Sequence, residues 1–298
     1  MSSTQQTTPV SSKVMAWQQA KQAVQSNTKY IAFGFLVLFA LVVGGVLLWI
    51  FVFKKKDEEG AQPQQEEEQQ PRPKMDVEYF AKNDTGTTSA TARSVAHTGT
   101  STGAVGLTLS KVNTVDSRWK LTSGGSLQLA ETFDPGAQFT LLVWVKPEGS
   151  AGLKVLVSNS PGGWAADGFR LFWNTFTADE TGNDRALNVE VGDGTAGSVL
   201  KSANNVMVAN QWRMVGVTFD RTNSKAVLYI DGVQVGESTD MRFSAKTAGP
   251  WVFGALRSDG DWARAVDSLF GWMGISRSIM TPAQVKQQFD MTKSEFTN

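Results

Sequence analysis

Residues 211–235 read QWRMVGVTFDRTNSKAVLYIDGVQV and decide the fold of the chain. Residues 214–219 and 226–230 are short apolar-rich runs with the length and alternation of β-strands. The second run ends at Asp231-Gly232, after which Val233 begins a third. A two-residue Asp-Gly connection is the strongest short hairpin signal, because a type I′ turn needs a positive φ at both central positions. The stretch therefore predicts antiparallel strands closed by a tight hairpin.

The same alternation continues on both sides of this stretch. Residues 139–146, FTLLVWVK, place two sets of side chains on opposite faces: Phe139, Leu141, Val143 and Val145 on one, and Thr140, Leu142, Trp144 and Lys146 on the other. Pro147 ends that strand, because proline cannot donate to a strand ladder. Residues 168–173, 187–191 and 270–275 repeat the pattern. We therefore predict an all-β antiparallel sandwich over residues 75–298.

One helix follows the last predicted strand. Thr281, Pro282 and Gln284 have the spacing of a capped helix start, with Thr as N-cap, Pro at the first helical position and Gln three residues after the cap. Val285 and Phe289 then lie on one apolar face of that helix.

Four motifs, taken together, resemble a known family. They are FTLLVWVKP at 139–147, QWRMVGVTFD at 211–220, AVLYIDGV at 226–233, and FGWMGIS at 270–276 with MTPAQV at 280–285. In this order they resemble the laminin-G-like branch of the concanavalin A-like lectin/glucanase jelly rolls, over about residues 115–290. The resemblance implies two stacked antiparallel sheets with a concave face and a rim of loops. It also implies a mostly non-catalytic module that binds glycans or proteins, often with calcium, and that occurs in membrane-tethered forms.

The chain departs from that family where chemistry would lie. Relatives commonly carry an acidic residue after the Gly-x-Ile step of the closing strand, and the matching position here is Gly274. Glucanases of this fold need paired carboxylates on one strand face, and no such Glu-x-Asp-x-Glu motif occurs. The nearest pairing, Glu190 with Asp193, spans a strand end and a turn. We therefore expect a protein that is not an enzyme.

Composition excludes several further classes. Lys and Arg together number 28, as do Asp and Glu, and this zero net charge argues against a nucleic-acid partner. The absence of Cys excludes disulfides, thiolate nucleophiles and zinc knuckles. His97, the single histidine, lies in a Thr/Ser/Gly-rich stretch, so we expect a solvated loop histidine rather than a member of a catalytic triad.

Candidate ligand contacts lie in Gly- and Asp-rich segments, where exposure is expected. They are Trp164, Asp193, Asp259, Asp261 and Trp262. The two tryptophans offer rings on which sugars stack, whereas Trp144 and Trp212 lie in strand motifs and are expected to pack. The carboxylates lack the five or more oxygens in register that calcium requires, so the expected turns are plain Asp-Gly turns and no cofactor is predicted.

The N-terminal quarter predicts a membrane anchor. Residues 30–53 contain no charged side chain and, as a helix, are long enough to cross a hydrocarbon core of about 30 Å. Residues 1–29 form a tail with a short amphipathic stretch, and residues 54–74 a charged Gln/Pro/Glu-rich disordered linker. The expected anchor residues, with aromatic rings near the interfaces and a closing lysine cluster, are Tyr30, Gly44, Trp49, Phe53, Lys54, Lys55 and Lys56.

Two functions remain open from the sequence. The first, which it favours, is a structural module that docks a neighbouring protein layer, such as a minor capsid or envelope-layer protein of a large DNA virus. The second is a membrane-tethered lectin or adhesin that binds a glycan. The lysines after residue 53 favour a cytoplasmic C-terminal domain, or one that faces the capsid from a virion inner membrane.

Overall fold

The computed structural model describes residues 71–84, 93–96, 106–129, 134–149, 152–160, 162–177, 182–243, 249–256, 264 and 266–297. The chain divides into two compact units, Met1–Gln70 and Pro71–Asn298, and only the second contains described residues. The predicted anchor at residues 30–53 and nearly all of the predicted linker therefore lie outside the described residues. Within the described ranges, the helices are too short or too polar to cross a membrane.

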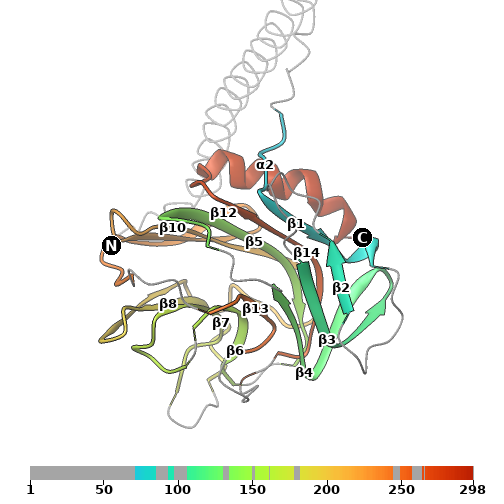
Figure 1. Cartoon of the computed structure of the whole chain (residues 1–298), viewed down its shortest axis with the longest axis horizontal. Coiled ribbons are helices and arrows are strands. Elements are labelled where there is room, and N and C mark those ends of the chain that lie inside the picture. The colour runs from blue at the N-terminus through green and yellow to red at the C-terminus, as the bar shows by residue number, and fades with distance from the viewer. Residues whose placement is uncertain are drawn as a thin grey trace, which may run out of the picture. The chain divides into compact units, whose positions relative to one another are not determined.

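The second unit is an antiparallel β-sandwich with two layers (Figure 1). The first layer contains, in spatial order, β12 (Val233–Ser238), β11 (Lys225–Ile230), β10 (Arg213–Asp220), β5 (Gln138–Pro147), β14 (Ser268–Ser276) and β1 (Val77–Phe80). The second layer contains β9 (Gly197–Lys201), β8 (Leu187–Gly192), β7 (Gly168–Trp173), β6 (Lys154–Ser158) and β13 (Val252–Phe253).

The long strand β4 (Arg118–Leu129) joins the two layers at one side. Its first part pairs with β14 through Trp119, and its last part pairs with β13 through Leu127. β3 (Gly106–Val115) and β2 (Arg93–Ala96) continue from β4. The prediction of an all-β antiparallel sandwich is confirmed, and the strands predicted from alternation correspond to β5, β7, β8, β10, β11, β12 and β14.

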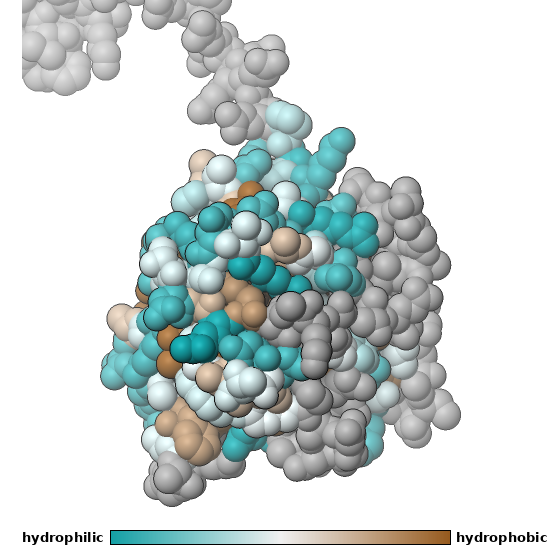
Figure 2. Space-filling model, turned by 60° about the vertical axis from the view of Figure 1, so that its left-hand side comes forward, coloured by the Kyte–Doolittle hydropathy of each residue, from teal (hydrophilic) through white to brown (hydrophobic). Residues whose placement is uncertain are grey.

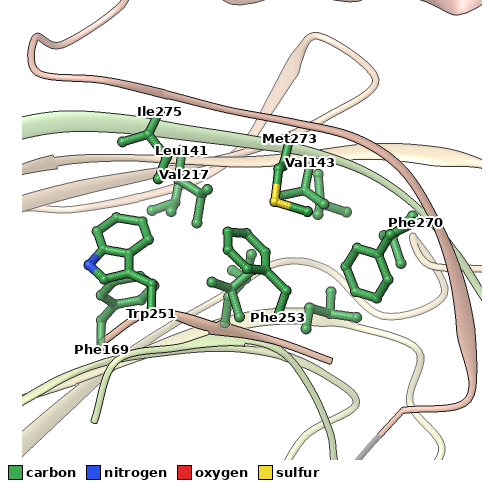
Figure 3. Packing of buried hydrophobic residues seen from close by; sticks show 14 of the residues in the cluster. Leu141, Val143, Phe169, Val217, Trp251, Phe253, Phe270, Met273 and Ile275 are labelled. Atoms are coloured by element: carbon green, nitrogen blue, oxygen red, sulfur yellow. The ribbon is translucent and has the colours of Figure 1, made fainter. Parts of the chain in front are cut away.

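The hydrophobic core lies between the layers (Figure 3). All four residues predicted for one face of β5 are buried there, together with Val217, Met273 and Ile275. From the second layer Phe169 and Trp251 face them, with ring centroids 4.9 Å apart in an edge-to-face arrangement. Such contacts add to the free energy gained by burying the rings.

The outer face of the first layer is covered by α2 (Pro282–Thr292), the helix predicted from its cap. The side chain of Thr281 accepts a hydrogen bond from the backbone N–H of Gln284, and the Gln284 side chain accepts one from the backbone N–H of Thr281. Beneath the helix, the indole N–H of Trp144 donates to Thr292 Oγ1 at 2.8 Å. Leu142 and Trp144 are therefore buried on the face of β5 opposite to the core.

The predicted hairpin is confirmed at Asp231-Gly232. The two residues have φ angles of 52° and 79°, and Ile230 pairs with Val233 across them. Helix α2 also lies against this turn, since a Cβ atom placed on Gly232 would be 2.9 Å from Lys286 Cδ.

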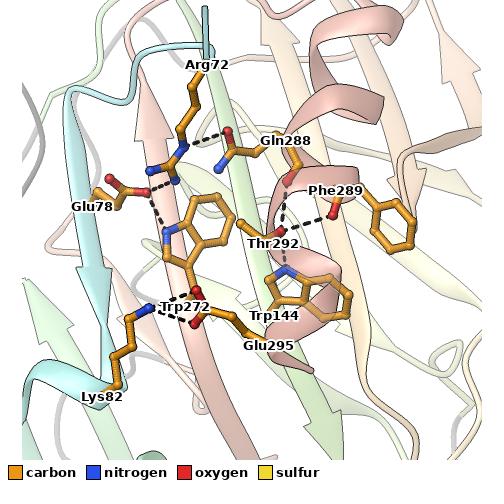
Figure 4. Close-up of polar contacts among 9 residues, drawn as sticks. All are labelled: Arg72, Glu78, Lys82, Trp144, Trp272, Gln288, Phe289, Thr292 and Glu295. Carbon is orange, nitrogen blue, oxygen red and sulfur yellow. Dashed lines mark hydrogen bonds and ion pairs between the residues drawn. The ribbon is translucent and has the colours of Figure 1, made fainter. Parts of the chain in front are cut away.

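The N-terminal segment of the unit is attached to α2 and β14 (Figure 4). Arg72 forms an ion pair with Glu78 and donates from Nε to Gln288 Oε1 at 3.3 Å. Glu78 also accepts from the indole N–H of Trp272 at 2.7 Å. Lys82, in the short 3₁₀ helix η1 (Ala81–Asn83), pairs with Glu295 in η2 (Lys293–Glu295) at 2.8 Å. The compact unit thus begins at Pro71, slightly before the predicted boundary at residue 75.

Candidate functional site

The outer face of the second layer is where the exposed candidate residues lie. Alternate residues of β7, β8 and β9 point inward to the core, so Arg170, Glu190 and Val199 point outward from three adjacent strands. Arg170 is 2% exposed, whereas Val199 is 48% exposed. Part of this face is closed by a small apolar cluster composed of Leu153, Val155, Phe172 and Leu256. The remainder, toward the β8–β9 hairpin, combines buried charge with exposed apolar surface.

Arg170 holds a loop against this face. Its Nη1 donates to Glu190 Oε2 at 3.1 Å, and its Nη2 donates to the carbonyl oxygens of Gly163 at 2.6 Å and Ala166 at 3.3 Å. Burial lowers the pKa of Arg170, and the charge of Glu190 opposes that shift. Burial likewise raises the pKa of Glu190, against the charge of Arg170. Because an arginine keeps its proton even when its pKa is depressed, the pair remains a guanidinium held against a carboxyl group.

The loop held by Arg170 presents Trp164, which is 50% exposed. A Cβ atom on Gly197 would lie 2.8 Å from Cε2 and 2.9 Å from Cδ2 of that ring. These atoms form the fused bond of the indole and are reached only through a ring face. One face of the Trp164 ring therefore lies against Gly197. The exposed surface of the side chain belongs to the rest of the ring. We call this ring and the glycine beneath it the Trp164 platform.

Glycines on the β8–β9 hairpin allow the loop to approach this closely. A Cβ atom on Gly192 would be 2.2 Å from the carbonyl oxygen of Ala166, which is less than any real contact. The N–H of Gly194 donates to the carbonyl of Ala165 at 2.8 Å, so the loop is bonded to the hairpin as well as packed on it.

Asp193 closes the turn of the same hairpin. Its Oδ1 accepts from Thr195 Oγ1 at 2.6 Å and from the backbone N–H groups of Thr195 and Ala196, both at 2.8 Å. These hydrogen bonds, the Thr195 side chain foremost, lower the pKa of Asp193 to about 2. Asp193 is therefore a turn-forming residue at the base of the Trp164 platform, and the structure brings these two predicted candidates together.

The other candidates do not join this site. Asp259, Asp261, Trp262 and His97 lie outside the described residues. Trp144 is buried under α2, and Trp212 packs against Phe296 with ring centroids 5.1 Å apart.

In the part of the chain that the structure describes, no group of three or more Asp, Glu or His side chains lies close enough together to bind a metal ion. At Gly274, where the family resemblance implied an acidic residue in relatives, a Cβ atom would be 2.7 Å from the Trp272 ring and 3.0 Å from Met75 Cγ. A carboxylate at this position would displace the packing of the first layer.

Buried polar atoms of the second layer that lack a hydrogen-bond partner among the described residues include Ser160 Oγ, Arg170 Nε, Trp173 Nε1 and Asn188 Oδ1. Buried polar atoms are usually satisfied by protein or by ordered water. Sequence reasoning did not select Arg170 as a site residue. The sequence does carry one feature that could have pointed to Arg170. It is a charged residue between the apolar Phe169 and Leu171, just after a Gly-rich segment.

Comparisons with known proteins agree on the fold. A family model described as the concanavalin A-like lectin/glucanases superfamily matches residues 121–286. A structure of Trypanosoma rangeli sialidase in complex with 2,3-difluoro-KDN is 13% identical, with a TM-score of 0.56 over 76% of this chain and 34% of that one. A second, in complex with 2,3-difluorosialic acid, is 12% identical, with a TM-score of 0.55 over 76% of this chain and 35% of that one. The chain thus spans about a third of the length of these sialidase structures.

A carbohydrate-binding domain is also similar. The CBM40 domain of Ruminococcus gnavus IT-sialidase, bound to alpha2,3 sialyllactose, is 15% identical, with a TM-score of 0.46 over 57% of this chain and 94% of that domain. No curated protein matches the chain significantly. At these identities a structural likeness shows the fold alone. The family match, which covers more than half of the chain and agrees with the two-layer architecture, carries the assignment: the chain belongs to the concanavalin A-like lectin/glucanases superfamily.

Proposed function

We propose that the second unit is a non-catalytic glycan-binding module that uses the Trp164 platform. The observation that carries this proposal is a half-exposed indole fixed over Gly197 by a loop that is itself bonded to the sheet. The C–H face of a pyranose stacks on such a ring, and a ring that is already ordered loses little conformational freedom on binding.

Neighbouring groups supply the polar part of such a site. Glu190 lies opposite Val199, which is two residues along β9 from Gly197. At about 3.3 Å per residue the carboxylate is roughly one sugar width from the platform along the strand. Arg170 donates to Oε2 of Glu190, and in the proposal the other carboxylate oxygen accepts a hydrogen bond from a hydroxyl group of the stacked sugar. Its side chain retains 14% exposure.

Docking of a protein layer, which the sequence favoured, has less support from the surface. The outer face of the first layer is covered by α2, and the outer edge of β9 is covered near Leu200 by Gly236 of β12. The N–H of Arg242 donates to Ser198 Oγ at 2.7 Å on the same edge. Among the described residues drawn in Figure 2, hydrophobic side chains form small patches separated by hydrophilic ones. Protein-binding surfaces usually present larger patches.

Three parts of the proposal rest on the sequence and on local geometry. Glu190 is paired with Arg170, and Asp193 is held in its turn by hydrogen bonds. A glycosidase needs two carboxyl groups that flank the bond to be cleaved, and these two residues are not arranged in that way. We therefore propose that the module is not an enzyme. We also propose that residues 30–53 anchor it to a bilayer, with the module on the cytoplasmic side or facing a viral capsid.

A glycan array tests the proposal. The full chain in detergent should bind a restricted set of glycans, and Trp164→Ala should lower the affinity by at least about tenfold, because the stacking surface is lost. Met291→Ala is the matched control, since Met291 is also 50% exposed but lies on α2. Failure of the wild-type chain to bind any glycan, or equal loss of binding in both variants, would contradict the proposal.

A further inference from the structure

We propose that Arg170 is a positioning residue for ligand binding, which acts by fixing the Trp164 loop without touching the ligand. This inference rests on the proposed glycan-binding function. It starts from the burial of Arg170, whose 2% exposure leaves no surface for a ligand to contact.

The guanidinium connects three elements at once. One nitrogen, Nη1, is directed to Glu190 on β8, and the other, Nη2, to two carbonyl oxygens of the loop, at Gly163 and Ala166. These carbonyls flank Trp164 and Ala165 on both sides. The loop is thereby fixed at both ends of the residue that presents the ring.

Two further hydrogen bonds hold the loop, and both join backbone groups. Ala166 N–H donates to Gly163 O at 3.0 Å inside the loop, and Gly194 N–H donates to Ala165 O at 2.8 Å from the hairpin. The bonds from Arg170 come from a side chain and reach the backbone on both sides of Trp164. The planar fork of Arg170 directs donors to fixed positions, which a lysine ammonium does not reproduce. Arg170→Lys should therefore keep the charge and release the loop.

The consequence for binding is a loss of preorganisation. A Trp164 ring that leaves Gly197 must be ordered again when a ligand stacks on it, and this ordering reduces the affinity. The charge pair with Glu190 explains why an arginine is tolerated in so buried a position, because an unpaired buried cation would be strongly destabilising.

The test uses 5-fluorotryptophan in the full chain in detergent micelles, with the Trp164 fluorine signal assigned through Trp164→Phe. In Arg170→Lys we expect the Trp164 signal alone to move toward the position of a solvated indole, and glycan affinity to fall by at least about tenfold. Arg213→Lys is the matched control. Arg213 also pairs with a carboxylate, Asp231, but at the other hairpin, and it should leave the Trp164 signal unchanged.

The fluorine signal separates this inference from the proposed function. If no glycan binds the wild-type chain but the Trp164 signal moves in Arg170→Lys, the function fails and the positioning role stands. If the signal and the affinity are unchanged in Arg170→Lys, the positioning role is wrong. Should Arg170→Lys unfold the domain and shift every signal, Glu190→Gln decides: a change confined to Trp164 supports the inference, and an unchanged Trp164 signal overturns it.

Discussion

Gly197 has no side chain to place between its backbone and the Trp164 ring, and the geometry of the site depends on this. A Cβ atom here would meet both the ring and the Trp164 carbonyl, at 2.8 Å and 2.5 Å. Gly197→Ala should therefore lift the loop, lower glycan affinity by about tenfold, and cost about 1–3 kcal/mol of the free energy of unfolding. Gly162 lies in the same loop and has nothing within 4 Å of its position for a Cβ atom. Equal effects of Gly162→Ala and Gly197→Ala, measured by titration and denaturant unfolding, would contradict this explanation.

Asp193 makes the turn beneath the platform sensitive to acid. Its pKa of about 2 lies below the ordinary value of 3.8, so the carboxylate favours the folded state above about pH 4. That contribution should be lost as the pH falls toward 2, because protonation then removes acceptor strength from the bonds of Thr195 and Ala196. The difference in melting temperature between wild type and Asp193→Asn should accordingly shrink between pH 5 and pH 2. A difference that does not depend on pH would show that the carboxylate charge has no role in the turn.

Single residues were the hardest part of the site to predict. Trp164 and Asp193 were selected as candidates because they lie in Gly- and Asp-rich segments, where exposure is expected. Arg170 was not, because its role depends on carbonyl oxygens from a loop whose path over the hairpin has no sequence pattern. Gly192 and Gly197 were also not singled out, since their meaning comes from the backbone that lies on them.

At the scale of elements, the β11–β12 hairpin is the best-specified feature of the chain. Both turn residues have positive φ, as the Asp-Gly signal requires, and α2 rests on the glycine. Gly232→Val should cost more than about 1 kcal/mol, because a β-branched residue is strained at this φ and would also meet Lys286 and Phe289. Thermal unfolding checks this, with Val233→Thr at a 57% exposed neighbouring position as control. An unchanged melting temperature for Gly232→Val would count against the assigned turn.

The strands that were predicted are those with clear alternation and a buried face. β3 and β4 were not predicted, because the stretch that forms them is rich in Ser, Thr and Gly and is held by pairing with β14 and β13. β9 and β13 are too short to show a period. The helix was predicted from its cap, but its position over Trp144 and Leu142 was not. Apolar residues on both faces of β5 indicate that both faces are buried, but they do not show which element covers each face.

At the scale of the whole unit, the segment that begins at Pro71 and the Trp164 platform belong to different layers. Arg72 is bound to Gln288 of α2 on the outer face of the first layer (Figure 4), whereas Arg170, which holds the Trp164 loop, belongs to β7 of the second layer.

The proposed cytoplasmic side of a membrane is open to a direct test. Asn83, in the sequence Asn-Asp-Thr, is exposed in η1, so it is available to a glycosylating enzyme if the unit is translocated. The proposed cytoplasmic location predicts that glycosidase treatment after expression in a eukaryotic cell leaves the mobility of the chain unchanged. A mobility shift that disappears in Asn83→Gln would place the unit in the lumen or outside the cell.

The central claim is that a glycan stacks on Trp164. The most direct test follows the fluorine signal of that ring while the chain is titrated with the best-binding glycan of the array. We predict that the Trp164 signal shifts saturably, with the same dissociation constant as binding measured by calorimetry, while the signals of the buried tryptophans stay in place. Saturable binding with an unmoved Trp164 signal would contradict the claim and place the ligand elsewhere on the molecule.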